Sequence, residues 1–96
     1  MGYDPVVVRE ALSELERARG LALGAALRRA RGDMPVRELA ARSGLAEETI
    51  RKIERGGVPT PALFTVAAIT AVLEVPLDDL VRAVTTAADT ADTAVA

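Results

Sequence analysis

Apolar residues recur along most of this chain at intervals of three and four, which is the spacing of helices rather than strands. The pattern predicts two short helices, at residues 36–43 and 46–55, joined by a turn at Gly44. A glycine there supplies the positive φ that a tight helix exit requires. The inward positions of the two helices are Val36, Leu39, Ala40, Ile50 and Ile53. A helix, a glycine turn and a second helix have the spacing of a DNA-binding helix-turn-helix.

The residues before this pair also favour helix. Asp4 followed by Pro5 is typical of a helix start, because Asp caps the first turn and Pro fits the first helical position. An apolar stripe then runs through Val8, Leu12 and Leu15. Two interpretations fit the stretch around Gly20 and Gly24: a new helix begins near residue 21, or one helix continues to residue 31.

Two more helices are expected after the pair. One starts at Pro61 with Thr60 as its cap, and the last covers residues 77–86. The apolar positions of the first of these are Leu63, Val66, Ala67, Thr70 and Leu73. The end of the chain, residues 85–96, is rich in Ala, Thr and Asp and has little to bury, so we expect a flexible tail. The chain as a whole is predicted to be all-α.

Composition removes several classes of function. The 96 residues include no Cys and no His, so disulfides, thiolate sites and histidine-based acid–base catalysis are excluded and zinc would find only carboxylates. We therefore expect no enzyme activity, no metal and no cofactor. No apolar run is long enough to cross a membrane, and the N-terminus lacks a signal-peptide pattern, so we expect no membrane association and a cytoplasmic location.

Charge is distributed unevenly. The formal net charge is −2, yet residues 20–60 hold eight basic and five acidic side chains, whereas residues 61–96 hold one and five. The predicted helix-turn-helix is therefore basic and the C-terminal part acidic, which favours double-stranded DNA as the partner of the central segment.

From about residue 23 to residue 80, roughly 58 of the 96 positions, the chain resembles the Cro/repressor-type, or xenobiotic-response-element, helix-turn-helix family of bacterial transcriptional regulators. The resemblance implies a compact five-helix domain at 21–84. Residues 1–20 lie outside it and form an extra N-terminal helical extension, and residues 85–96 are the tail. The matching pieces are Leu39-Ala40, Gly44-Leu45, Thr49-Ile50, Ile53-Glu54-Arg55-Gly56, Pro59 with Pro61, and Leu77-Asp78-Asp79-Leu80.

Positions carried over from the family give the expected DNA contacts. The resemblance implies that the helix at 46–55 enters the major groove and that Lys52 and the two glutamates beside it face base edges. Glu47 and Glu48 also have a second interpretation, as residues that stabilise the start of the helix, because the helix dipole favours acidic side chains in the first turn. The full set of expected contacts is Arg37, Glu47, Glu48, Thr49, Arg51, Lys52, Arg55 and Gly57.

The resemblance also implies an ion pair between Glu54 and an arginine of the preceding long helix. Counting without gaps gives Arg29, and matching the Leu-Arg dipeptide gives Arg28. Two positions depart from the family pattern: Val36 replaces a phosphate-binding Gln, and Ala46 replaces a Ser or Thr cap.

Two functions remain after these exclusions. The first is sequence-specific DNA binding by a homodimer, with the N-terminal helix or the helix at 77–86 as the contact between copies. The second is a protein-interaction module on the same fold, antitoxin-like or anti-repressor-like. The acidic residues of the second helix and the pI of about 5.1 favour this alternative.

Overall fold

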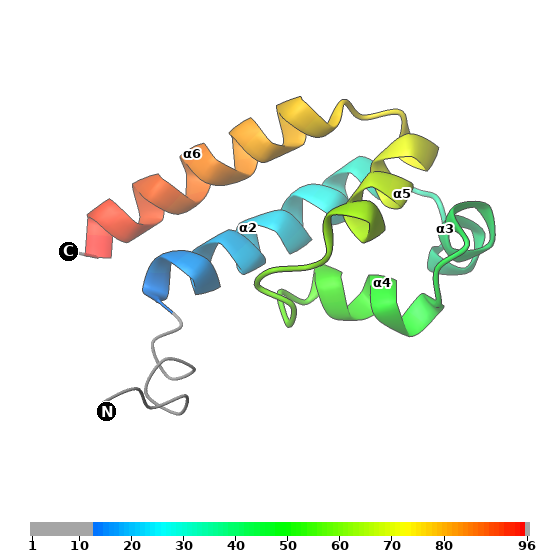
Figure 1. Cartoon of the computed structure of the whole chain (residues 1–96), viewed down its shortest axis with the longest axis horizontal. Helices are drawn as coiled ribbons and strands as arrows, with labels where there is room; N and C mark the ends of the chain where they lie inside the picture. Colours follow the sequence, from blue (N-terminus) through cyan, green and yellow to red (C-terminus); the bar gives the residue numbers. More distant parts are fainter. Residues whose placement is uncertain (1–12, 96) are drawn as a thin grey trace, which may run out of the picture.

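A computed structural model of the chain describes residues 13–95, with side chains as far as Asp89. This part forms five helices and contains no strand (Figure 1). They are α2 (Glu14–Arg31), α3 (Val36–Ser43), α4 (Glu47–Glu54), α5 (Leu63–Leu73) and α6 (Leu77–Val95). The all-α prediction is confirmed. The expected helix start at Asp4 and Pro5 lies outside the described residues.

The first described helix begins at a capping box. The backbone N–H of Glu16 donates to Ser13 Oγ at 3.0 Å, and the backbone N–H of Ser13 donates to Glu16 Oε1 at 2.9 Å. From there α2 runs without interruption to Arg31. Of the two interpretations above, the continuous helix is right, and the boundary expected between residues 20 and 21 falls inside it.

The two glycines inside α2 are explained by close packing. A Cβ on Gly24 would lie 2.5 Å from the carbonyl oxygens of Ile53 and Glu54, and one on Gly20 would lie 2.8 Å from the Cα of Pro59. Neither position has room for a side chain. The glycines therefore let α2 rest directly on the C-terminal end of α4 and the loop that follows, which fixes α4 in place.

The predicted helix pair is present at the expected place. α3 has the bounds predicted for it, and α4 begins and ends one residue inside the predicted range. Gly44 has φ 80°, and its N–H donates to the carbonyl of Ala40 at 2.9 Å, as a left-handed helix exit requires. Ala46 caps α4 without a side-chain hydrogen bond, as expected for alanine.

The start of α5 differs from the prediction. Its N-cap is Ala62 rather than Thr60, and the helix begins two residues after Pro61. Val66 and Thr70 are buried as their spacing predicted, but Leu63 is 59% exposed. The expected stripe therefore starts one turn too early, because the chain is still bent at residues 59 and 60.

The prediction of a flexible tail at 85–96 was wrong over most of its length. α6 continues to Val95, and Ala88 is 1% exposed. In Figure 1, α6 runs alongside α2, and the two helices share the largest contact in the fold. The small side chain at residue 88 suits this close packing, because it lies four and eight positions after the inward-facing Val84 and Leu80.

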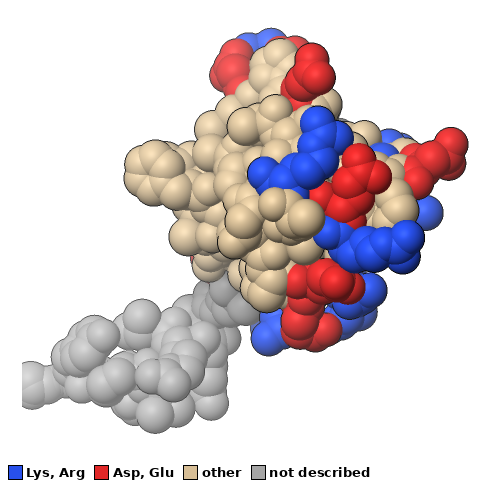
Figure 2. Space-filling view, turned by 90° about the vertical axis from the view of Figure 1, so that its right-hand side faces the viewer, with Lys and Arg blue, Asp and Glu red and all other residues tan. Residues whose placement is uncertain are grey.

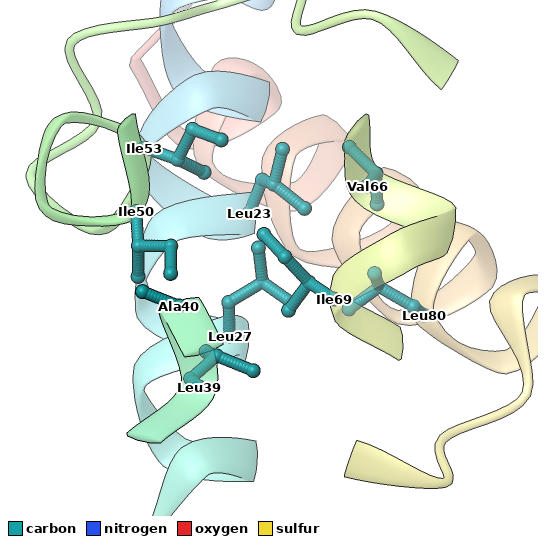
Figure 3. Close-up of a cluster of buried hydrophobic side chains, with 9 residues drawn as sticks. All are labelled: Leu23, Leu27, Leu39, Ala40, Ile50, Ile53, Val66, Ile69 and Leu80. Atoms are coloured by element: carbon teal, nitrogen blue, oxygen red, sulfur yellow. The ribbon is translucent and has the colours of Figure 1, made fainter. Parts of the chain in front are cut away.

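The hydrophobic core lies where all five helices converge (Figure 3). The largest fully buried side chains are those of Leu27, Leu39, Ile50, Ile53 and Ile69. Ile50 and Ile53 point from α4 into this cluster, so the opposite side of α4 is left facing outward. Core packing thereby presents one helix face to solvent, and that face carries the candidate site.

Candidate nucleic-acid interface

The outward face of α4 consists of charged side chains and the partly exposed Thr49. All of its charged members are exposed: Glu47, Glu48, Arg51, Lys52 and Arg55. Figure 2 views the molecule from its α3 end, and basic and acidic side chains alternate on one side of that view. The face has the cations that a polyanion would bind, but carboxylates lie among them.

Within the free protein these charges pair with one another. Arg51 Nη2 lies 3.1 Å from Glu47 Oε1, one helical turn away, and Arg55 Nη2 lies 3.2 Å from Glu48 Oε2. All four side chains are between 46% and 66% exposed, so each pair contributes only about 0.2–1 kcal/mol. Such pairs open at little cost, which leaves both arginines able to change partner.

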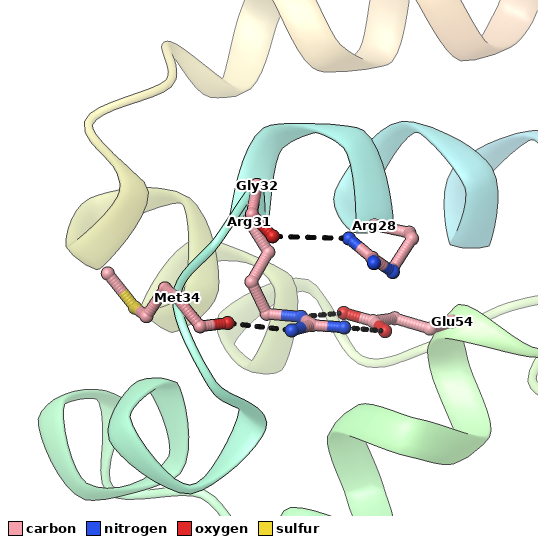
Figure 4. A network of polar contacts seen from close by, with 5 residues as sticks. All are labelled: Arg28, Arg31, Gly32, Met34 and Glu54. Carbon is pink, nitrogen blue, oxygen red and sulfur yellow. Dashed lines mark hydrogen bonds and ion pairs between the residues drawn. The ribbon is translucent and has the colours of Figure 1, made fainter.

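A third acid of α4, Glu54, is held differently. Arg31 Nε donates to Glu54 Oε2 at 2.7 Å and Arg31 Nη2 donates to Glu54 Oε1 at 2.8 Å, so the pair is bidentate (Figure 4). The third nitrogen, Nη1, donates to the carbonyl of Met34 at 2.7 Å. Both side chains are 11% exposed. Hydrogen bonding to Glu54 raises the pKa of Arg31, and this outweighs the opposing effect of burial, so Arg31 stays cationic at physiological pH.

The expected partner of Glu54 was therefore wrong: it is neither Arg28 nor Arg29. Arg28 donates instead to the carbonyl of Gly32 at 3.3 Å, and Arg29 is exposed. Helical phase explains why it is not Arg29. Arg31 lies seven residues after Gly24, so it faces the same side of α2 as the glycine that touches α4. Arg29, two residues before Arg31, points about 160° away from Arg31.

Beside this ion pair lies a basic hollow of about 380 Å³. Its lining joins the end of α2, the start of α3 and the outward face of α4. The lining residues are Arg28, Arg31, Val36, Arg51, Glu54 and Arg55. Arg28 belongs to this hollow although the sequence analysis gave it no contact with a ligand. The sequence did contain an indication of this position, because Arg28 follows Gly24 by one helical turn and therefore lies on the same face of α2.

A second hollow, of about 190 Å³, lies on the other side of α4. Thr49 and Lys52 line it from α4, and Ala62 and Thr65 line it from the start of α5. The surface of α4 thus continues directly onto α5.

The two remaining expected contacts lie at the margins of α4. Arg37 is exposed in the first turn of α3, and Gly57 follows α4, with its N–H donating to the carbonyl of Lys52 at 3.0 Å. The fold therefore gathers the sequence-predicted residues on and around α4.

A sequence model described as helix-turn-helix matches residues 25–80. The chain belongs to this helix-turn-helix family. The matched range runs from the middle of α2 to the start of α6 and includes the α3–α4 pair. The Cro/repressor-type assignment made from the sequence is confirmed. This family is one of DNA-binding domains, not of enzymes.

Another finding agrees with the helix-turn-helix assignment. A stretch of 57 residues is 46% identical to the "Uncharacterized HTH-type transcriptional regulator RghRB" of Bacillus subtilis (strain 168). The match spans 59% of this chain and 40% of that relative. The likeness thus covers the domain and leaves more than half of the relative unmatched. None of the helices in residues 13–95 is both long enough and apolar enough to span a bilayer.

Proposed function

We propose that this chain is a sequence-specific DNA-binding transcriptional regulator that places α4 in the major groove and acts as a dimer. The observation that carries the proposal is the charged face of α4, held outward by the core on one side and by the buried Arg31–Glu54 pair at its end. A recognition helix must be rigidly placed, because base contacts tolerate little displacement. Family membership supports the same function.

Phosphate contacts fall to the basic hollow and the margins of α4. Arg28 and Arg55 line the hollow, and a phosphate placed there would meet guanidinium groups from two different helices. Arg37 and the backbone at Gly57 extend this set on either side. These contacts would position the domain on DNA without reading its sequence.

Base contacts fall to the middle of α4. Lys52 and Thr49 lie on its outward side, and no ion pair engages Lys52 among the described residues. Arg51 could also contact DNA after its ion pair with Glu47 opens, by binding a guanine or a phosphate instead. Glu47 and Glu48 would then accept from cytosine or repel an unsuitable base, which makes them determinants of specificity rather than of affinity.

Binding of the full chain to a labelled duplex of mixed sequence, measured over a salt series, tests the phosphate contacts. We expect affinity to fall steeply with salt, and Arg28→Ala or Arg55→Ala to reduce the log–log slope by about 1 each. Arg82→Ala is the matched control, since that arginine is exposed on α6 and pairs only with acids of its own helix among the described residues. It should leave the slope unchanged.

One observation favours the second candidate, a protein-binding module. Every carboxylate of α4 is paired with an arginine, which lowers the positive charge that the helix offers to DNA. No binding to the duplex even at low salt would favour this alternative and reject a DNA-binding role.

A further inference from the structure

The helix next to the charged face has no charge at all. The α5 sequence, LFTVAAITAVL, contains no acidic or basic residue. Val66, Ile69 and Thr70 on its inner side are buried, but Phe64 is 81% exposed and Leu63 is 59% exposed. A helix that is apolar all round is normally covered on every side. Nothing in residues 13–95 covers the outer side of α5.

The outer side of α5 has a particular shape. Phe64, Ala68 and Ala71 follow one another by four and three residues, so they share one stripe. The stripe points away from the core, since Phe64 lies on the opposite side of the helix from Val66 and Ile69. One end of it carries a large ring and the other end carries methyl groups. The two ends are about 10 Å apart along the helix.

The apolar surface continues from α5 onto α6. A groove of about 300 Å³ runs between them, lined by Leu63, Leu77, Val81 and Val84 among others. Val81 is 52% exposed at its edge. Next to it on α6 stand Arg82 and the two acids with which it pairs, so the border of the patch carries both signs of charge.

We propose that the outer face of α5 is the surface through which two copies of this chain associate, with their α5 helices antiparallel. A two-fold axis near Ala67 and Ala68 would bring Phe64 of each copy onto Ala71 of the partner subunit. Large then meets small at both ends, which is the self-complementarity that a two-fold interface requires.

A second copy explains the patch better than a small ligand or an anionic partner. The groove is open and its lining is apolar apart from Arg19 and Thr85, and Arg19 pairs with Asp89 of α6. The α5 face is also continuous with the α4 surface through the hollow that Thr49, Lys52, Ala62 and Thr65 line. Pairing through α5 would therefore place the two α4 helices on either side of the axis, as half-sites about 34 Å apart require.

The role given to the dimer rests on the proposed DNA-binding function, but association itself is measured without DNA. Sedimentation velocity on the full chain, from micromolar to millimolar concentration, should show a reversible dimer, because the proposed contact uses one face of the 11-residue helix α5 and the neighbouring edge of α6. Phe64→Glu should raise the dimer Kd by about tenfold or more, since a buried aromatic anchor is lost.

The chain offers a matched pair of exposed leucines as a control. Leu63 lies in the patch and is 59% exposed, while Leu21 lies on α2 outside it and is 62% exposed. Leu63→Gln should weaken the dimer and Leu21→Gln should not, with both variants melting near the parent temperature. A chain that stays monomeric throughout, or equal weakening by both variants, would overturn the proposal.

Cysteine crosslinking tests the antiparallel arrangement, because the chain has no cysteine of its own. Helices with alanine at the contact approach to about 8 Å, which brings residues at the axis within disulfide reach. Ala68→Cys should crosslink to its copy on oxidation, and Ala41→Cys, exposed on α3, should not. A dimer that forms without this crosslink would overturn the arrangement.

Failure of the dimer and failure of the proposed function can be separated. A monomer that binds one selected DNA sequence would reject the α5 surface and keep the DNA-binding role. A dimer that is sensitive to Phe64 and binds no DNA would keep the α5 surface and reject that role.

Discussion

The outward faces of α4 and α5 lie next to each other and expose opposite chemistry. Every exposed side chain of α4 and of its C-cap Arg55 is charged, whereas α5 has no charged residue. In Figure 2, blue and red side chains lie at the right, the bottom and the top of the view, and the left side is tan. The first chemistry suits a polyanion that is bound reversibly and in a salt-dependent way. The second suits a dry contact with another apolar surface.

The charged face itself contains two kinds of ion pair. Those of Glu47 and Glu48 are exposed, while the Arg31–Glu54 pair is 11% exposed and bidentate. Exposure separates their roles. The exposed pairs can release their arginines to a ligand, and the buried pair holds α4 against α2. The charged residues of a predicted DNA-binding helix therefore fall into two groups: those held in buried structural ion pairs and those free to contact DNA.

The largest expected effect comes from the buried pair. Arg31→Ala should lower the free energy of unfolding by about 3–5 kcal/mol, because it leaves Glu54 buried without its partner. Thermal or urea unfolding followed by circular dichroism measures this. The control is Arg82→Ala, which removes exposed pairs and should cost about 1 kcal/mol or less. Equal losses of stability in the two variants would mean that the Arg31–Glu54 pair does not hold α4 against α2.

A smaller effect is expected from the middle of α4. Lys52→Ala should weaken binding to the preferred DNA sequence by about 1–3 kcal/mol, and binding to random sequence by much less. Parallel titrations of both duplexes measure the difference. Arg17→Ala is the control, because Arg17 lies at the exposed start of α2 and pairs with Glu14 there, and it should leave the ratio of the two affinities unchanged. If Lys52→Ala weakens both duplexes equally, Lys52 contacts phosphate rather than a base.

The smallest effect comes from the carboxylates that hold the exposed arginines. Glu48→Gln should free Arg55 and remove a charge that repels DNA, so affinity for random sequence should rise by about two- to fivefold. The same titrations at low salt detect this gain. Glu38→Gln on α3 is the matched control, because Glu38 forms a comparable exposed pair with Arg42. A loss of affinity in Glu48→Gln would show that Glu48 makes a favourable contact with DNA.

Much of the fold followed from local pattern. The α3–α4 pair could be predicted because period, glycine exit and buried positions agree over a short stretch, and Gly44 has the positive φ expected of it. The end of α6 could not be predicted from its composition. Residues 85–95 are poor in large apolar side chains, but a small side chain at 88 packs against α2 once the two helices lie together. That stabilisation comes from tertiary packing, which composition does not record.

The candidate site shows the same division. The residues along α4 were predicted from spacing and resemblance, and the fold brings them to one face. The partner of Glu54 was not predicted correctly, because aligning residue numbers with a family pattern does not show which side of α2 contacts α4. The contact of Gly24 with the end of α4 sets that side, which excludes Arg29 and includes Arg31. Likewise Arg28 joins the basic hollow through its helical phase and not through any motif.

The most direct test of the central claim is selection of the full chain on a pool of random duplexes, followed by sequencing of the bound fraction. If α4 reads bases and α5 pairs two copies, the pool should yield a two-fold symmetric site with half-sites about one helical turn apart. A pool that shows no enrichment, from a protein that binds no duplex at low salt, would contradict DNA recognition by this domain.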